Sequence, residues 1–158
     1  MKLDDFSHSV AERLFAQFPE WRELAKIERA GDGTGYLQLE IPAPACASVV
    51  SGITITTDNA EVTIGFDYYH AHFFEQVGDG EHFGTDYAFY FLSQLLSENI
   101  SVVSWWLGAD WVGFSTIEDG KPLMDNSLIG AYDRVRIRSW KGTLNADKTP
   151  NPSFKRDA

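Results

Sequence analysis

Two histidines, His70 and His72, lie two residues apart in the aromatic stretch FDYYHAHFF. On a β-strand both side chains would point to the same side, so both imidazoles could bind one metal ion. Zinc needs at least a third protein ligand, which Glu75 or His82 could supply, and a hydrolytic centre would also keep a position open for water. A metal-dependent enzyme is therefore one hypothesis for these residues.

A second interpretation comes from the strand that should carry the histidines, which is expected to begin near Glu61 and to continue through FDYYHAHFF. Alternation places Val62 and Ile64 on the histidine face and Tyr69 on the opposite face. The upstream part of the histidine face is then core, and the histidines lie at its rim with a structural or partner-binding role. We favour this interpretation, and with it no cofactor, no catalytic residue and no enzymatic activity.

The stretch SWWLGADW contains three tryptophans that could anchor a partner. Adjacent strand residues face opposite sides, so one of Trp105 and Trp106 is expected in the core while the other is covered elsewhere or exposed. Trp111 follows Asp110, and an indole beside a carboxylate suits a cationic group.

Two helices and several strands must position these residues. Apolar residues at three- and four-residue spacing predict a first helix that Pro19 ends and a second that begins at Thr85 or Asp86 and ends near Asn99. Strands are expected at Tyr36–Ile41, at the hairpin ITITTDNAEVTI, and later at SVVSWWLG, WVGFSTI and DRVRIRSW.

Crossover helices between successive strands are missing from this pattern, which favours antiparallel pairing. We predict a single α+β domain over residues 1–143, with a mostly antiparallel sheet of about five to seven strands and two main helices packed on it. The polar, proline-containing residues 144–158 are expected to form a disordered C-terminal tail.

Charge is distributed unevenly along the chain, whose net charge is −10. No Lys or Arg occurs from Ala30 to Gly120, and all thirteen charged residues there are acidic. Such a surface serves solubility or attracts a cationic partner, and it disfavours nucleic acid, because phosphate binding needs clustered cations. The arginines of the last predicted strand, Arg134, Arg136 and Arg138, are expected to pair with neighbouring carboxylates.

Cysteine content and hydropathy indicate a soluble cytoplasmic protein without membrane contact. The single cysteine, Cys46, excludes an internal disulfide framework and any cysteine-rich zinc cluster. No apolar run approaches the roughly 20 residues of a membrane span, and the amino terminus carries acids where a signal peptide needs cations.

Three segments, LEIPAP, ITITTDNAEVTIGFDYYHAHF and SWWLGADW, give residues 36–117 a resemblance to the immunity proteins encoded beside bacterial polymorphic toxins. The resemblance is to this broad class. It implies a non-enzymatic inhibitor that binds one cognate toxin domain in the cytoplasm of the producing cell.

A basic toxin domain would complement the acidic surface, with fast, salt-sensitive association. The predicted partner-binding residues are carboxylates of the Lys- and Arg-free span with an aromatic anchor among them: Asp67, Tyr69, Glu75, Asp79, Glu81, Asp110 and Trp111. The alternatives are the metal-dependent enzyme, with His70, His72, Glu75 and His82 as candidate ligands, and a ligand-binding or regulatory domain.

Overall fold

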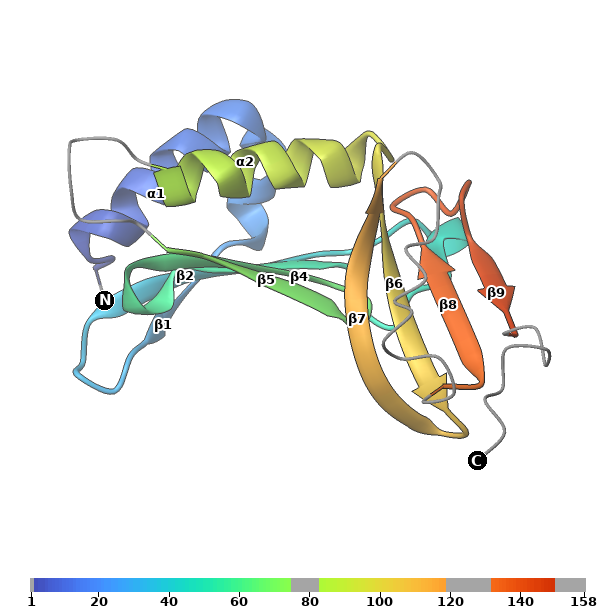
Figure 1. The fold of residues 1–158 in the computed structure, drawn as a ribbon. Coiled ribbons are helices and arrows are strands. Elements are labelled where there is room, and N and C mark those ends of the chain that lie inside the picture. Colours follow the sequence, from blue (N-terminus) through green and yellow to red (C-terminus); the bar gives the residue numbers. More distant parts are fainter. Residues whose placement is uncertain (1, 75–82, 119–131, 150–158) are drawn as a thin grey trace. The chain divides into compact units, whose positions relative to one another are not determined.

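A computed structural model describes residues 2–74, 83–118 and 132–149 of the chain (Figure 1). These residues belong to two compact units. The first unit comprises Met1–Pro42, Ser51–Phe66 and His70–Leu92. The second unit comprises Ala43–Val50, Asp67–Tyr69 and Ser93–Ala158.

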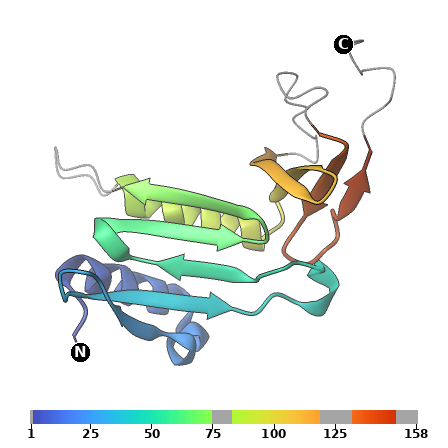
Figure 2. The same cartoon turned by 90° about the horizontal axis from the view of Figure 1, so that it is seen from below.

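The sheet of the first unit has the order β1-β2-β3-β4-β5, so strands that follow one another in the chain are neighbours (Figure 2). The strands are β1 Lys26–Arg29, β2 Gly35–Ile41, β3 Ile53–Thr56, β4 Glu61–Phe66 and β5 Tyr69–Phe74. Buried and more exposed residues alternate along β2 and β3, as expected for a sheet with one face on the core.

Two α-helices, α1 Asp5–Gln17 and α2 Phe83–Leu96, lie on the same side of this sheet (Figure 1). Asp4 caps α1 by accepting a hydrogen bond from the Ser7 amide at 2.6 Å. After α1 the chain enters the 3₁₀ helix η1 Pro19–Leu24, and two shorter 3₁₀ helices, η2 Ala45–Ala47 and η3 Asp58–Ala60, lie in later connections.

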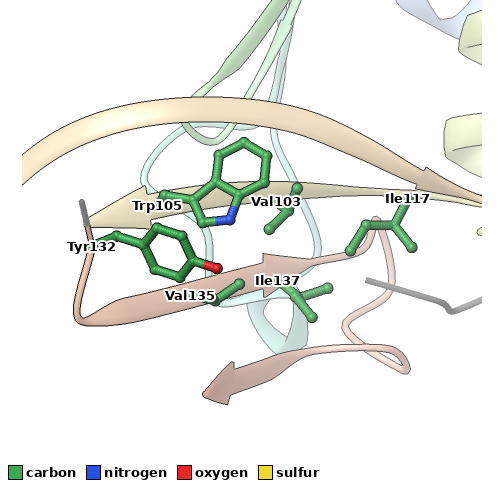
Figure 3. Packing of buried hydrophobic residues seen from close by; sticks show 6 residues of the cluster. All are labelled: Val103, Trp105, Ile117, Tyr132, Val135 and Ile137. Atoms are coloured by element: carbon green, nitrogen blue, oxygen red, sulfur yellow. The ribbon is translucent and has the colours of Figure 1, made fainter. Parts of the chain in front are cut away.

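The sheet of the second unit is also antiparallel and has the order β7-β6-β8-β9. Its strands are β6 Ile100–Leu107, β7 Asp110–Glu118, β8 Arg134–Arg138 and β9 Ala146–Lys148. One face of this sheet carries a buried cluster of Val103, Trp105, Ile117, Tyr132, Val135 and Ile137 (Figure 3). Alternation along β6 and β8 places the next residues in sequence on the opposite face, where the candidate site lies.

The α+β class, the antiparallel pairing and the two main helices predicted from the sequence are confirmed. The strands within the described residues form two sheets, of five and four strands, where one sheet of about five to seven was expected. Periodicity identifies strands locally, but long-range pairing decides to which sheet each belongs.

The stretch FDYYHAHFF is not one strand, which corrects the continuous strand predicted from Glu61. β4 ends at Phe66, Asp67 adopts a left-handed conformation with φ 53°, and β5 begins at Tyr69. Asp is one of the few residues other than Gly that tolerate this conformation, so a tight turn forms without a glycine. In β5 the histidines are exposed and Tyr69 is half-buried, which reverses the predicted faces.

The segment Ala146–Lys148 also differs from the prediction, because it forms β9 inside the region expected to be a disordered tail. Its partner is β8, with Ala146 opposite Ile137 and Lys148 opposite Val135. The short strand is polar, so its own sequence carries no apolar alternation, and pairing with β8 provides the order. Residues 150–158 of the expected tail lie outside the described residues.

Candidate partner-binding site

A β-bulge in β7 determines which aromatic side chains meet on the second sheet. Trp111 is opposite Trp106 and Gly113 is opposite Trp105, which leaves Val112 as the extra residue. Strand residues three apart ordinarily face opposite sides, but one extra residue brings Trp111 and Phe114 to the same face. Their ring centroids are 5.4 Å apart.

Five aromatic rings of the second unit form a row in space, in which each ring contacts the next. We call it the ring row, and its order is Trp106, Tyr68, Trp111, Phe114 and Tyr69. The Trp106–Tyr68 centroids are 4.6 Å apart, edge to face, and Tyr68–Trp111 are 5.9 Å apart. Phe114 then contacts Tyr69 edge to face at 5.4 Å. All four separations fall within the range of aromatic pairs, and two of the pairs are edge to face, a preferred arrangement.

Two arginines of β8 stack on rings of this row. The Arg134 guanidinium carbon is 4.9 Å from the centroid of the Trp106 ring, and that of Arg136 is 5.9 Å from the centroid of Tyr68. Both distances are within the range of cation–π attraction. The face therefore binds cations of its own chain against aromatic rings.

The β6–β7 hairpin ends in an exposed group that we call the hairpin tip: Leu107, Asp110, Trp111, Val112 and Asp133. Leu107, Trp111 and Val112 are 49%, 42% and 41% exposed, and both aspartates are exposed. The indole nitrogen of Trp111 donates to the Gly113 carbonyl at 2.9 Å, and Oδ2 of Asp133 accepts from the Gly108 amide at 3.0 Å. The tip thus combines apolar surface, an oriented indole and two carboxylates.

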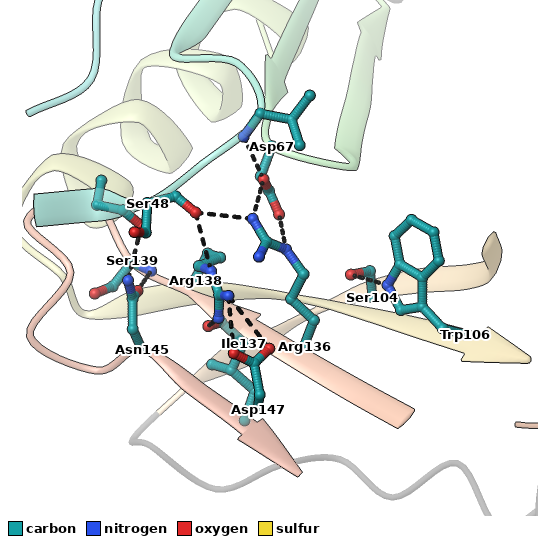
Figure 4. A network of polar contacts seen from close by, with 12 residues as sticks. Ser48, Asp67, Ser104, Trp106, Arg136, Ile137, Arg138, Ser139, Asn145 and Asp147 are labelled. Atoms are coloured by element: carbon teal, nitrogen blue, oxygen red, sulfur yellow. Dashed lines mark hydrogen bonds and ion pairs between the residues drawn. The ribbon is translucent and has the colours of Figure 1, made fainter. Parts of the chain in front are cut away.

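Asp67 lies in a different environment, within a buried ion pair of the second unit (Figure 4). Its oxygens accept from Arg136 Nη2 at 3.0 Å and from Nε at 3.2 Å, and Oδ1 also accepts from the Val50 amide at 2.9 Å. The Asp67 side chain is 1% exposed. This carboxylate is therefore neutralised and inaccessible, and it does not belong to an acidic surface.

The next arginine of β8, Arg138, pairs with Asp147 of β9 at 3.2 and 3.0 Å and donates to the Ser48 carbonyl at 3.2 Å (Figure 4). Pairing of these arginines with carboxylates, predicted from the sequence, is confirmed for Arg136 and Arg138. The third arginine, Arg134, stacks on Trp106.

Of the predicted partner-binding residues, Asp110 and Trp111 lie at the hairpin tip as consecutive strand residues that face opposite sides of the sheet, and Tyr69 lies at the end of the ring row. Burial raises the pKa of the Tyr69 hydroxyl above its usual value, so this phenol stays neutral over the physiological range. Glu75, Asp79 and Glu81 lie outside the described residues.

The candidate metal ligands His70 and His72 lie on the exposed side of β5 in the first unit, with ring centroids 5.2 Å apart. Nδ1 of His72 is 2.8 Å from a carboxylate oxygen of Glu61 and 3.0 Å from the Thr63 hydroxyl. Within residues 2–74, 83–118 and 132–149, no three His, Cys, Asp or Glu side chains form a group that could hold a metal ion. Glu75 and His82, the other candidate ligands, lie outside this part of the chain.

Several site residues were not identified from the sequence: Tyr68, Leu107, Phe114 and Asp133. Tyr68 and Phe114 depend on the turn at Asp67 and on the bulge at Val112, neither of which contains a diagnostic glycine pair. Asp133 reaches the tip only because β8 pairs with β6, which no local pattern shows. The signal that could have drawn attention to Phe114 is the Gly113 before it, since glycine inside a strand is typical of a bulge.

No α-helix within the described residues is long and apolar enough to cross a membrane. Comparisons with models of protein families, with curated proteins and with solved structures find no match for this chain.

Proposed function

We propose that this chain is a non-enzymatic immunity protein that binds and neutralises a cognate basic toxin domain through the hairpin tip. The site of action in this proposal is the cytoplasm of the bacterium that produces both proteins. The observation that carries the proposal is the half-exposed, oriented indole of Trp111 at a tip that also exposes two carboxylates. The sequence resemblance described above supplies the class of partner.

Trp111 has the properties of a binding anchor. Its ring is oriented by the hydrogen bond to Gly113 and by contacts with Tyr68 and Phe114, yet 42% of the residue is exposed. Tryptophan is enriched at interface hot spots, and a side chain that is already ordered loses little conformational entropy on binding. Exposed Leu107 and Val112 extend the apolar surface on either side of the turn.

Electrostatics favours a basic partner for this anchor. Asp110 and Asp133 place two exposed carboxylates at the tip of a chain whose net charge is −10. Arg134 follows Asp133 in the chain and stacks on Trp106, so its retained positive charge offsets part of the negative charge beside the tip. A field of this sign accelerates association with a positively charged partner and makes it dependent on ionic strength.

The test compares capture of partners by the wild-type chain and by a tip variant, Asp110→Asn with Trp111→Ala and Asp133→Asn. The asparagine introduced at position 133 keeps an oxygen that can accept from the Gly108 amide, so the turn is preserved. A matched control is Glu118→Gln, which removes one carboxylate from the opposite end of the same strand. Tagged proteins are incubated with lysate of the source cells at low and high salt, and bound polypeptides and metals are identified by mass spectrometry.

We expect one stoichiometric basic protein on the wild type and on the control, released by salt and absent from the tip variant. The purified chain should then inhibit that protein's activity in a direct assay. A basic partner that binds the tip variant equally well would contradict the proposed site. A partner that stays fully active in the complex would contradict neutralisation, and one equivalent of bound metal without a partner would support the enzyme hypothesis instead.

A further inference from the structure

We infer that the outer edge of β1 pairs with β1 of a second copy of this chain, in an antiparallel register centred on Ile27. The inference goes beyond the proposed function, because β1 belongs to the first unit and none of its residues belongs to the hairpin tip. It assigns a role to a strand whose four residues are all exposed.

The backbone of β1 has one open edge. β1 lies at one end of the strand order β1-β2-β3-β4-β5, so β2 pairs with it on one side only (Figure 2). Just past the strand, the Ala30 amide donates to the Thr34 carbonyl at 2.9 Å, in the register of the β1–β2 ladder. Hydrogen-bonded pairs occupy every second position of an antiparallel ladder, so Glu28 is bonded to β2, whereas the backbone N–H and C=O groups of Ile27 and Arg29 point away from it.

The contacts of β2 support this assignment. Leu37 is the partner of Ile27, and its amide donates to the Thr57 hydroxyl at 2.9 Å while its carbonyl accepts from the Thr57 amide at 3.1 Å. Both backbone groups of Leu37 are therefore used on the side of β2 away from β1. No other strand in the described part of the chain pairs with β1, which leaves the outward groups of Ile27 and Arg29 open to a further strand.

The side chains of β1 favour a second copy as the source of that strand. In the register centred on Ile27, this residue faces Ile27 of the second copy, and Lys26 of each copy faces Glu28 of the other. These Lys26–Glu28 positions are not hydrogen-bonded, so their Cα atoms are only about 4.5 Å apart and opposite charges there stabilise the pairing. Within the described residues, neither Lys26 nor Glu28 forms an ion pair of its own.

Other registers that bring the open backbone groups together are disfavoured. A register centred on Lys26, Glu28 or Arg29 would place that residue opposite its own copy. Like charges directly opposite each other destabilise a strand pair. The strand is thus complementary to itself in the register that also brings the 41% exposed side chains of Ile27 together.

The dimer should be weak, because a strand of four residues offers a small contact. Specific interfaces below about 1,200 Å² belong to the weak, transient class. Each copy carries a net charge of −10, so the copies repel each other at long range. At about 150 mM salt the Debye length is about 8 Å, which screens the long-range repulsion more than the close Lys26–Glu28 attraction.

The experiment is sedimentation velocity of the full-length protein in about 150 mM NaCl, at concentrations from about 10 μM to about 1 mM, the range of weak association. The charge variants are Lys26→Glu, Glu28→Lys, the double variant with both changes, and an equimolar mixture of the two single variants. Glu12→Lys is the matched control, since it makes the same change of charge at an exposed position of α1.

Two further variants test the backbone. Ile27→Pro removes an N–H that β2 does not use, and proline is tolerated on an edge strand where its nitrogen faces solvent. Ile27→Ala removes most of the side chain but keeps the N–H. Ile27→Pro should therefore weaken self-association more than Ile27→Ala does.

We expect the sedimentation coefficients of wild type and Glu12→Lys to rise with concentration toward the value of a dimer. Each single charge variant places like charges at both Lys26–Glu28 positions and should weaken self-association about tenfold or more. The mixture and the double variant should recover it, because opposite charges face each other again in both.

A wild type that stays monomeric to about 1 mM would overturn self-pairing and leave the edge to a strand of another protein. Single charge variants that associate as tightly as wild type would show that the copies meet through another surface. A mixture that stays monomeric would overturn the register centred on Ile27. Urea midpoints show whether each variant is folded, and recovery in the double variant cannot arise from misfolding caused by either substitution.

Discussion

Single carboxylates of the second unit differ in role because they differ in burial. Asp67 is 1% exposed and forms a two-point ion pair with Arg136, whereas Asp147 is 57% exposed and pairs with Arg138. Removing one partner of a buried pair leaves a charge without compensation, while an exposed partner is replaced by water. The two pairs therefore have similar geometry and different energetic weight.

Replacing Asp67 by Asn should lower the free energy of unfolding by about 2–3 kcal/mol, because Arg136 loses its counter-charge in a mostly buried position. Asn tolerates the left-handed backbone at this position, so the change isolates the charge. Asp147→Asn is the comparison and should cost less than Asp67→Asn, because water reaches the exposed position of Asp147 and the buried Arg138 still donates to the carbonyls of Ser48, Ile137 and Ala146. Urea denaturation followed by tryptophan fluorescence measures the free energy of unfolding of both variants. Equal losses of stability would contradict the different energetic weights of the two ion pairs.

Glu98 offers a pH-dependent test at the same scale. Burial alone would raise the pKa of this carboxyl, but hydrogen bonds from Ser139, Thr143 and the amide of Lys141 outweigh that effect and lower the pKa. The folded state then binds fewer protons than the unfolded state, so the stabilisation is complete above the ordinary value of 4.5 and is lost as the pH falls through the lower folded-state pKa.

Glu98→Gln should therefore be less stable than wild type at neutral pH, and the difference should shrink on acidification below about pH 4.5. Denaturant titrations of both proteins at a series of pH values measure how the difference in their free energies of unfolding depends on pH. Thr143→Val removes one donor to Glu98 and should reduce the pH-dependent part of the difference. A difference that is constant with pH would show that Glu98 acts only through packing.

At the scale of elements, two irregularities assemble the candidate site. The turn at Asp67 delivers Tyr68 and Tyr69 to the ring row, and the bulge at Val112 turns Trp111 to the side of Phe114. A regular β7 would place these two rings on opposite faces. Bulges are typical of sites where a side chain must be redirected, and this one lies beside the hairpin tip.

The connection between β8 and β9 provides an element-scale prediction. Gly142 has φ 76°, and a side chain there would collide with the backbone carbonyl of Cys46. Gly142→Ala should lower the free energy of unfolding by about 2 kcal/mol or more, through backbone strain and displacement of the Ala45–Ala47 turn. Gly31→Ala is the matched control, because a Cβ at Gly31 meets nothing within 4 Å.

Thermal denaturation measures both glycine variants. If Gly142→Ala were as stable as Gly31→Ala, the close approach of Gly142 to Cys46 would not be a constraint on the fold.

At the scale of the whole molecule, acidic charge exceeds basic charge, with 23 Asp and Glu against 13 Lys and Arg. Arg136 and Arg138 each pair with one carboxylate, Asp67 and Asp147, so these two ion pairs leave the excess of acidic charge unchanged. The excess destabilises the compact state by self-repulsion and at the same time supplies the field that would attract a basic partner.

Added salt should therefore stabilise the free protein. Raising NaCl from about 10 mM to about 200 mM shortens the Debye length severalfold, and Tm should rise by roughly 2–4 °C, which corresponds to about 1 kcal/mol. Near the isoelectric point the same addition should have little effect, which serves as the control. A Tm that falls with salt at neutral pH would show that attractive pairs outweigh the repulsion.

Much of the fold follows from the sequence, because the signals are local. Several local patterns predict elements that the structure contains. These patterns are the apolar stripe that ends at Pro19, the alternation in Gly35–Ile41 and in Arg134–Arg138, and the hairpin turn at Asp58–Ala60. The antiparallel α+β class follows from the order of those elements. The pairing of Arg136 and Arg138 with carboxylates also follows from the sequence. Arginines at alternate positions of a strand in an acidic chain are most easily neutralised by carboxylates of neighbouring segments.

The sequence by itself therefore determined most of the elements, the sign of the net charge and the adjacent positions of Asp110 and Trp111 in the chain. Only the tertiary structure decided that the strands form two sheets, that Asp67 is buried against Arg136 and that Asp133 joins the hairpin tip. Each of these depends on contacts between residues far apart in the chain, or on a single extra or left-handed residue that reverses the face of every side chain after it. Local periodicity contains neither kind of information.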